Sequence, residues 1–284
     1  MPSNKPIFVY HGNCHDGFGA AWVAHKVLGD NCTYTFGERD NPPKNVAGRD
    51  VYIADFTYSE EQLRELAAKA NRVINLDHHK TGGDVINKLI AEGVIEGEYN
   101  VNMSGASLAW KWFFKDEPAP DLVLYIEDRD LWLKQLPSCD DYFFSLLAYP
   151  MDFDVWTELS LRGSSEMIQE GKLLVRNQQN QIDQILSRGL STLHIEGFEV
   201  PVCNAPFMFA SDMGHQLSQG NDFAAIYTFH NDEIKFSLRS HDKGQDVAVI
   251  AAKFGGGGHR NSAGFTVSFD RVTFSKNKVS LSSS

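Results

Sequence analysis

Three short apolar runs in the first eighty residues have the length and composition of buried strands. They span residues 7–10, 51–54 and 72–76. Helical patterns separate them, over residues 18–28 and again over residues 59–70, where Ser59 and Gln62 have the spacing of a capping box. Strands that alternate with helices predict a doubly wound, mainly parallel sheet. We therefore expect an α/β fold for the first half of the chain.

The second half of the chain has a different character. Residues 164–188 are polar but keep the spacing of a helix, and β-rich segments follow from residue 192 onward. The last ten residues are rich in Ser and Lys, a composition typical of a frayed end. We predict four parts: a first domain over residues 1–163, a connecting helix over 164–189, a smaller α/β domain over 190–275, and a frayed tail over 276–284.

Composition limits the kinds of partner. The chain carries 26 Lys and Arg against 37 Asp and Glu, for a formal net charge of −11. Long nucleic acids are held mainly through phosphate contacts with basic side chains, so this charge argues against them but not against a short substrate. No run approaches the roughly 18 apolar residues of a membrane span. The four cysteines form no CxxC pair, and no secretory signal opens the chain, so we expect a cytoplasmic protein.

Acidic and histidine side chains lie where the predicted strands end. They are His11, Asp16, Asp55 and the triplet Asp77-His78-His79. In an open α/β sheet the loops at the carboxyl ends of the strands face one crevice, so we expect these residues to meet. Imidazole and carboxylate ligands together suit Mn²⁺, Fe²⁺ or Zn²⁺ better than Mg²⁺ alone. One Asp at a strand end is usually a turn residue, but the repetition at successive strands indicates a metal site.

Four consecutive glycines, Gly255 to Gly258, directly precede His259. A loop without Cβ atoms lets backbone amides approach a bound anion closely. A helix C-cap needs only one glycine, and no Gly-Lys-Ser/Thr of a Walker loop follows, although a flexible linker would have the same composition. Arg239 and Ser240 end a predicted strand, where the guanidinium group offers a fork for a phosphate. These features indicate anion binding in the second domain.

Together, these motifs resemble the DHH phosphoesterase superfamily in its DHHA1 subfamily, which includes nanoRNases and other oligonucleotide phosphodiesterases. The motifs are HGNCHDG at residues 11–17, IADF at 53–56, DHH at 77–79, YIEDRDLW at 125–132, FSLRS at 236–240 and FGGGGHRNSAGF at 254–265. One motif alone is weak evidence, whereas the ordered set spans nearly the whole chain. The resemblance implies a DHH domain joined by a helix to a smaller α/β DHHA1 domain.

The resemblance also implies a binuclear metal site with two divalent ions, usually Mn²⁺, in the first domain. Its ligands would be His11, Asp16, Asp55, His78 and Asp128. Asp55 would bridge the ions, Asp77 would hold His78 through a hydrogen bond, and His79 would face the scissile phosphate. The catalytic residues would be Asp77, His79 and Arg239, and the substrate-binding residues would be Arg239, Ser240, Gly256, Gly257, Gly258 and His259.

The chain departs from the family pattern in the first motif. Many members have an aspartate where this chain has Cys14, with His15 beside it. Either residue would replace that ligand, or one ion would be held more weakly. In the fourth motif Asp130 competes with Asp128, which the alignment to the family favours.

By this resemblance, the protein would be a metal-dependent phosphoesterase. It would hydrolyse phosphodiester or phosphoanhydride bonds in small nucleotides or short oligonucleotides, through attack by a metal-bridging hydroxide. Two alternatives stay open: an exopolyphosphatase- or pyrophosphatase-like hydrolase, and a catalytically weak nucleotide-binding sensor that kept the fold. The sequence also leaves open the substrate, the identity of the metal and whether the chain forms a homodimer.

Overall fold

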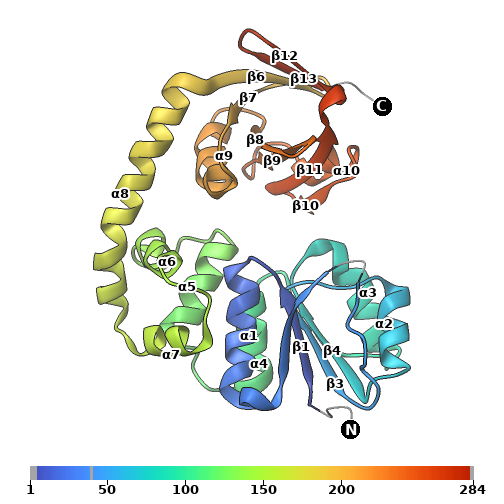
Figure 1. The fold of residues 1–284 in the computed structure, drawn as a ribbon. Helices are drawn as coiled ribbons and strands as arrows, with labels where there is room; N and C mark the ends of the chain where they lie inside the picture. The colour runs from blue at the N-terminus through green and yellow to red at the C-terminus, as the bar shows by residue number, and fades with distance from the viewer. Residues whose placement is uncertain (1–4, 39–40, 282–284) are drawn as a thin grey trace. The chain divides into compact units, whose positions relative to one another are not determined.

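The computed structural model describes residues 5–38 and 41–281, which form two compact units (Figure 1). Unit 1 comprises Met1–Val175 and unit 2 comprises Arg176–Ser284. The longest helix, α8 (Ser164–Gly189), begins in unit 1 and ends in unit 2. Within the described residues, no helix is both long enough and apolar enough to cross a membrane.

Unit 1 is built on a five-stranded sheet in which every pair of neighbours is parallel, in the order β2-β1-β3-β4-β5. The strands are β1 (Ile7–His11), β2 (Thr33–Gly37), β3 (Asp50–Ala54), β4 (Arg72–Asp77) and β5 (Glu96–Tyr99). This sheet confirms the predicted α/β fold. The three apolar runs are its central strands, β1, β3 and β4.

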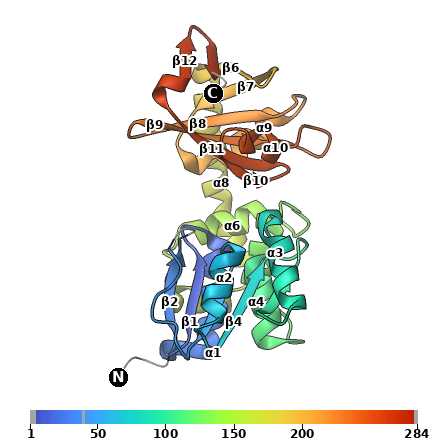
Figure 2. The same ribbon diagram turned by 90° about the vertical axis from the view of Figure 1, so that its right-hand side faces the viewer.

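Helices cover both faces of this sheet, as Figures 1 and 2 show. They are α1 (His15–Leu28), α2 (Glu60–Ala67), α3 (Lys80–Ala91), α4 (Gly105–Phe114), α5 (Asp121–Asp130), α6 (Cys139–Leu147) and α7 (Phe153–Leu161). One core holds Phe8 and Ile74 from the sheet against Trp22 of α1 and residues of α4 to α7. The opposite core holds Val9 and Ile53 against residues of α2 and α3. Side chains of a strand alternate between faces, so each central strand is apolar on both sides.

Unit 2 contains an eight-stranded mixed sheet in the order β10-β11-β9-β8-β7-β6-β13-β12. The strands are β6 (Leu190–Ile195), β7 (Phe198–Asn204), β8 (Ala224–His230), β9 (Glu233–Arg239), β10 (Gly257–His259), β11 (Ser262–Ser268), β12 (Val272–Ser275) and β13 (Lys278–Leu281). Helix α10 (Val247–Ala252) packs on one face, and α9 (Ala210–Ser218) packs on the other together with the end of α8.

Two predictions about this unit are corrected by the sheet. Most of the predicted tail is not frayed, because Lys278–Leu281 pairs with both β12 and β6 and buries Val279. Residues 282–284 lie outside the described part of the chain. The glycine run is not entirely a loop either, since Gly257–His259 is an edge strand paired antiparallel with β11.

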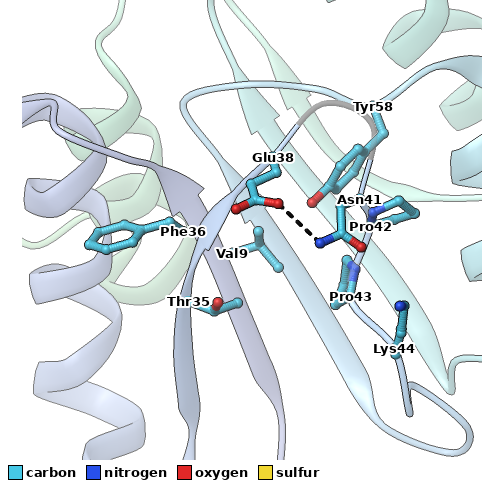
Figure 3. Close-up of a pocket in the computed structure, with 9 residues that line it drawn as sticks. All are labelled: Val9, Thr35, Phe36, Glu38, Asn41, Pro42, Pro43, Lys44 and Tyr58. Atoms are coloured by element: carbon cyan, nitrogen blue, oxygen red, sulfur yellow. Dashed lines mark hydrogen bonds between the residues drawn. The ribbon is translucent and has the colours of Figure 1, made fainter.

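A pocket of about 280 Å³ lies on the α2 side of the sheet of unit 1 (Figure 3). Val9, Thr35, Tyr58 and the loop residues 41–44 contribute to its lining. None of the predicted site residues lines this pocket. The site is therefore built at the end of the sheet and not in this pocket.

Candidate metal centre

The carboxyl ends of three adjacent strands carry the functional side chains of unit 1. His11 is the last residue of β1, Asp55 directly follows β3, and Asp77 is the last residue of β4. These strands are neighbours in the order β1-β3-β4. The parallel register therefore brings together residues that are up to 66 positions apart in the sequence.

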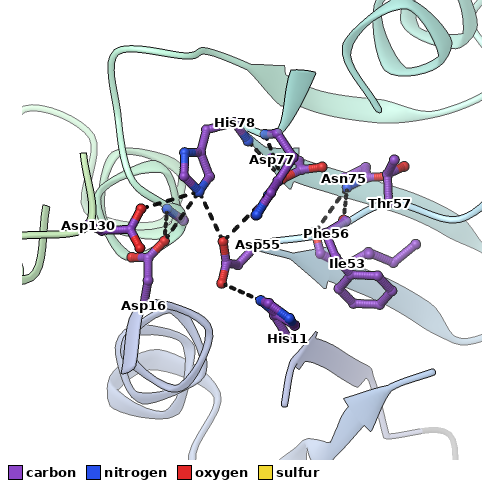
Figure 4. A network of polar contacts seen from close by, with 12 residues as sticks. His11, Asp16, Ile53, Asp55, Phe56, Thr57, Asn75, Asp77, His78 and Asp130 are labelled. Carbon is purple, nitrogen blue, oxygen red and sulfur yellow. Dashed lines mark hydrogen bonds and ion pairs between the residues drawn. The ribbon is translucent and has the colours of Figure 1, made fainter. Parts of the chain in front are cut away.

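Asp55 lies at the middle of the group and points one carboxylate oxygen to each side (Figure 4). Its Oδ2 is 3.3 Å from Nδ1 of His11, and its Oδ1 is 3.1 Å from Nε2 of His78. The residue is buried and its φ is 62°. Left-handed backbone is uncommon outside glycine, but aspartate tolerates it better than most residues.

Asp16 is held at the start of helix α4. Its Oδ2 accepts a hydrogen bond of 2.5 Å from the N–H of Gly105, and its Oδ1 accepts one of 2.8 Å from the N–H of Ala106. The first amides of a helix lack intrahelical partners and favour a negative charge. A Cβ at Gly105 would lie 2.7 Å from Cβ of Asp55, so only glycine allows this approach. Gly105 was not among the predicted site residues, because a single glycine gives no distinct signal in the sequence.

The side chains form two groups, each compact enough to hold an ion. His11, Asp55 and His79 form the first group, and Asp16, His78 and Asp130 form the second; the potential ligand atoms within each group lie within 4.8 Å of one another. In the second group Nε2 of His78 is 3.5 Å from Asp130 and 3.7 Å from Asp16. Asp55 belongs to the first group, and its Oδ1 also contacts the second. The geometry thus offers one shared carboxylate between two ligand sets.

The charges of this cluster favour a bound cation. Burial, reinforced by the charges of Asp55 and Asp130, raises the pKa of Asp16 well above its usual range. The side chain of Asp130 keeps 28% of its surface exposed, and partial desolvation together with the charge of Asp55 raises its pKa. Burial lowers the pKa of His78, but the neighbouring carboxylates outweigh it and raise the pKa to about 10. Burial also opposes ionisation of Asp55, yet its hydrogen bonds with His11 and His78 hold its pKa far below the usual range. Crowded carboxylates with imidazole neighbours are a donor set that fits divalent transition metals.

Asp77 contacts the two histidines that follow it in different ways. Its Oδ1 accepts hydrogen bonds from the backbone N–H groups of His78 and His79, at 2.8 and 3.2 Å. The same oxygen is 2.7 Å from Nδ1 of the His79 ring. Asp77 therefore holds His78 through the backbone N–H of that residue, and its contact with an imidazole ring is with His79. Among the described residues, the buried Oδ2 of Asp77 has no hydrogen-bond partner.

The sequence resembles two known proteins. No family model matches the chain. An uncharacterised protein, R106 of Acanthamoeba polyphaga mimivirus, is 30% identical over 287 residues, which cover 92% of this chain and 67% of R106. Oligoribonuclease NrnB of Bacillus subtilis is 24% identical over 240 residues, which cover 76% of this chain and 59% of NrnB. The chain belongs to the DHH phosphoesterase superfamily.

The fold agrees with this membership. RecJ from Thermus thermophilus, solved in complex with Mn²⁺, superimposes with a TM-score of 0.51 at 16% identity, over 92% of this chain and 49% of RecJ. Like the match to NrnB, this match covers less than two thirds of the other protein. The likeness to RecJ therefore supports the shared DHH fold.

Asp130, and not Asp128, reaches the second ligand group, beside Asp16 and His78. The two residues are two positions apart on helix α5, so their side chains point in directions roughly 200° apart around the helix axis. Only one of them can therefore face the ligand groups. The buried carboxylate of Asp128 instead accepts hydrogen bonds from the N–H groups of Gln135 and Leu136, at 2.8 and 3.2 Å. This corrects the preference for Asp128: its carboxylate caps the loop that follows α5.

We expect this difference to show in metal content. Asp130→Asn should weaken Mn²⁺ binding to the second ligand group by about 10-fold or more, because a charged ligand is lost. Asp128→Asn should lower the melting temperature, because its carboxylate binds the loop, and leave the number of bound Mn²⁺ ions unchanged. Calorimetric titration of the metal-free variants measures both quantities. Loss of Mn²⁺ from Asp128→Asn alone would restore Asp128 as the ligand.

Cys14 and His15 differ in their surroundings. The pKa of the Cys14 thiol is raised well above its usual range by burial and by Asp55, Asp130 and Asp16, so these carboxylates lie near it. The ring of His15 stacks on Trp156 with centroids 6.2 Å apart, and burial lowers its pKa to about 4. Both residues were predicted as possible replacements for the family's aspartate. Cys14 lies near the carboxylates, whereas His15 packs among aromatic rings. Neither is in the two ligand groups.

The predicted substrate-binding residues of unit 2 lie around the end of β9. Nη2 of Arg239 donates to Oγ of Ser211 at 3.0 Å, and Oγ of Ser240 donates to the carbonyl of Asp222 at 3.2 Å. Ser240 is buried, so its hydroxyl ties two segments of unit 2 together. Arg239 pairs in the sheet with Ser262 of β11.

Gly256, directly before β10, and the two glycines of β10 differ in how much space surrounds them. A Cβ at Gly256 would lie 2.1 Å from the carbonyl oxygen of Gly264, and one at Gly258, where φ is 143°, would lie 2.5 Å from that of Ser262. Gly257 has no heavy atom within 4 Å of such a Cβ. The fold therefore requires glycine at two of these positions, whereas at Gly257 it leaves an open approach to the backbone beside His259.

Proposed function

We propose that this DHH protein is a metal-dependent phosphoesterase that hydrolyses phosphodiester or phosphoanhydride bonds in small nucleotides or short oligonucleotides. The observation that carries the proposal is Asp55, whose two oxygens face two separate groups of ligands. One ion would be held by His11 and Asp55, and the other by Asp16, Asp55, His78 and Asp130. These residues would hold two such ions, most simply Mn²⁺, which would supply an activated water and neutralise charge on the phosphate.

The chain's own residues orient the reacting groups. Asp77 fixes the ring of His79 through Nδ1, which leaves Nε2 of that ring for a contact with the substrate beside His11 and Asp55. Burial opposes protonation of His79, but Asp77 and Asp55 outweigh it and raise the pKa of His79. With Nδ1 held by Asp77, Nε2 of His79 would face the phosphate and, when protonated, would donate a hydrogen bond to a phosphate oxygen as negative charge develops there. We assign His79 to the transition state and His78 to the metal.

Unit 2 is assigned to substrate binding. Arg239 would bind a phosphate, and the open backbone at Gly257 would approach the phosphate or the ribose, next to His259. The negative charge of the chain favours a short substrate. The name of NrnB, an oligoribonuclease, points to short RNA among such substrates.

A substrate panel with controlled metal tests the proposal. The protein is stripped with a chelator and then supplied with Mn²⁺, Co²⁺, Mg²⁺ or Zn²⁺ in the presence of an RNA dinucleotide, a cyclic dinucleotide, phosphoadenosine phosphate or polyphosphate. We expect a nucleotide substrate to be hydrolysed only after metal is returned. Full activity in chelator contradicts the proposal. Hydrolysis of polyphosphate alone would favour the exopolyphosphatase alternative, and nucleotide binding without hydrolysis would favour the sensor.

Substitutions in unit 2 test its role in binding. Gly257→Val is expected to raise KM with little change in melting temperature, because the side chain fits the fold but obstructs the backbone. Arg239→Ala should also raise KM, and Arg239→Lys should recover only part of the loss, since lysine forms no bidentate fork. Gly258→Ala is the contrasting variant, because it should destabilise the fold itself. Unchanged steady-state kinetics in Gly257→Val and Arg239→Ala would remove the assigned role.

A further inference from the structure

In the middle of strand β4, one polar side chain lies between apolar residues and is completely buried. This residue is Asn75, which lies between Ile74 and Leu76 and has no exposed surface. A buried amide is costly unless its hydrogen bonds are satisfied. The partners of Asn75 therefore show what the residue does in the fold.

All three hydrogen bonds of the Asn75 side chain go to the segment around Asp55 (Figure 4). Nδ2 donates to the carbonyl of Ile53 at 3.4 Å and to that of Phe56 at 3.0 Å, and Oδ1 accepts from Oγ1 of Thr57 at 2.6 Å. Carbonyl oxygens only accept, so the amide nitrogen must face them. The side chain thus holds the chain on both sides of Asp55.

This segment needs such support because of its backbone. Asp55 has a left-handed φ of 62°, a conformation that costs free energy in a non-glycine residue, although aspartate tolerates it better than most. Its N–H donates to the carbonyl of Leu76 at 2.9 Å, and strand β3 ends immediately before it. The turn directs the two carboxylate oxygens towards His11 and His78.

We infer that Asn75 is a positioning residue that fixes the turn around Asp55, with Thr57 as its partner, so that one carboxylate serves both ligand groups. The inference rests on the proposed function in one respect, namely that those groups bind metal ions. Asn75 itself does not reach the ligand atoms. Its effect passes through the backbone of Phe56 and the hydroxyl of Thr57.

Three variants probe the inference with little change of shape. Asn75→Asp keeps the outline of the side chain but places an oxygen against the two carbonyls, so the turn should relax. Thr57→Val removes the hydroxyl, whereas Thr57→Ser keeps it. We expect Mn²⁺ affinity to fall by about 10- to 100-fold in Asn75→Asp and Thr57→Val, the range found for residues that orient metal ligands. Thr57→Ser should restore most of the affinity.

Val73→Ala is the matched control for a purely structural effect. Val73 lies on the same strand and the same face, two residues before Asn75, and is buried in the core. This variant should lower the melting temperature without weakening Mn²⁺ binding at a temperature where the protein is folded. At saturating Mn²⁺, Asn75→Asp should lower kcat and leave KM for the substrate nearly unchanged.

Titration of metal-free protein with Mn²⁺ and hydrogen exchange of the amides of residues 55–58 provide the decisive readouts. Faster exchange of this segment in Asn75→Asp and Thr57→Val than in Val73→Ala, with weaker Mn²⁺ binding, supports the inference. Exchange and affinity equal to those of the wild type overturn it. A wild-type protein that binds no Mn²⁺ overturns the proposed function instead, and the exchange data, which need no metal, still decide the role of Asn75.

Discussion

Asp55→Asn is expected to produce the largest loss of activity of any single substitution in this protein. The amide keeps the shape of the side chain but removes the charge that both ligand groups share. We expect the number of tightly bound Mn²⁺ ions to fall from two to one or none. Turnover should fall by more than the roughly 10²- to 10³-fold that loss of one transition-state contact costs.

The control for Asp55→Asn lies on the same strand. Asp50 begins β3 at the opposite end of the sheet and forms an ion pair with Arg72. Asp50→Asn makes the same chemical change, and metal content and turnover should stay at the wild-type values. Elemental analysis and steady-state kinetics on the two variants give the comparison. Two bound ions and unchanged turnover in Asp55→Asn would show that Asp55 does not bridge.

The central strands could be predicted because they are buried on both faces. Residues 7–10 of β1 and 51–54 of β3 are continuous apolar runs, and residues 73–76 of β4 are apolar except for Asn75, so the sequence shows where the sheet lies. The edge strands were not predicted, because Thr33–Gly37 and Glu96–Tyr99 are largely exposed or half-buried and carry no apolar pattern. Pairing with a neighbour, and not side-chain burial, makes them strands.

Part of the metal centre could be predicted from the sequence for a similar reason. His11, Asp55 and the DHH triplet follow the central strands, so their convergence follows from the parallel sheet. The resemblance to the family favoured Asp128 over Asp130, and nothing else in the sequence indicates which of the two faces the other ligands. The loop after α5 decides it, since Asp128 caps that loop, and left-handed residues such as Trp132 and Lys134 shape its path. That path is set by tertiary contacts which no sequence periodicity reveals.

The hairpin of β12 and β13 shows how composition can mislead. A run of Ser and Lys resembles a frayed end, but Asn277, with a φ of 58°, turns the chain back. Val279 is then buried against the sheet through its pairing with Leu193 of β6, 86 residues earlier in the chain. A single buried valine among polar residues gives no detectable pattern, so the pairing appears only in the folded chain.

The two adjacent histidines of the DHH triplet should separate into different functions when each is replaced. His78→Ala should reduce Mn²⁺ content, because Nε2 of His78 faces Asp16, Asp55 and Asp130. His79→Ala should leave two ions bound and lower kcat by about 10²-fold or more, the scale of one lost transition-state hydrogen bond. In His79, Nδ1 is occupied by Asp77, so the ring is held for the substrate.

Asp77→Asn tests how the orientation of the His79 ring contributes, apart from the contact of that ring with the substrate. The amide can still meet the His79 ring, but it removes the charge that helps raise the pKa of His79. Turnover should therefore fall less than in His79→Ala, and Mn²⁺ content should stay near that of the wild type. Metal analysis beside single-turnover kinetics measures these quantities for all three variants. Equal loss of Mn²⁺ from His78→Ala and His79→Ala would instead make His79 a third ligand of the group that holds His11 and Asp55, whose ligand atoms lie within 4.8 Å of one another.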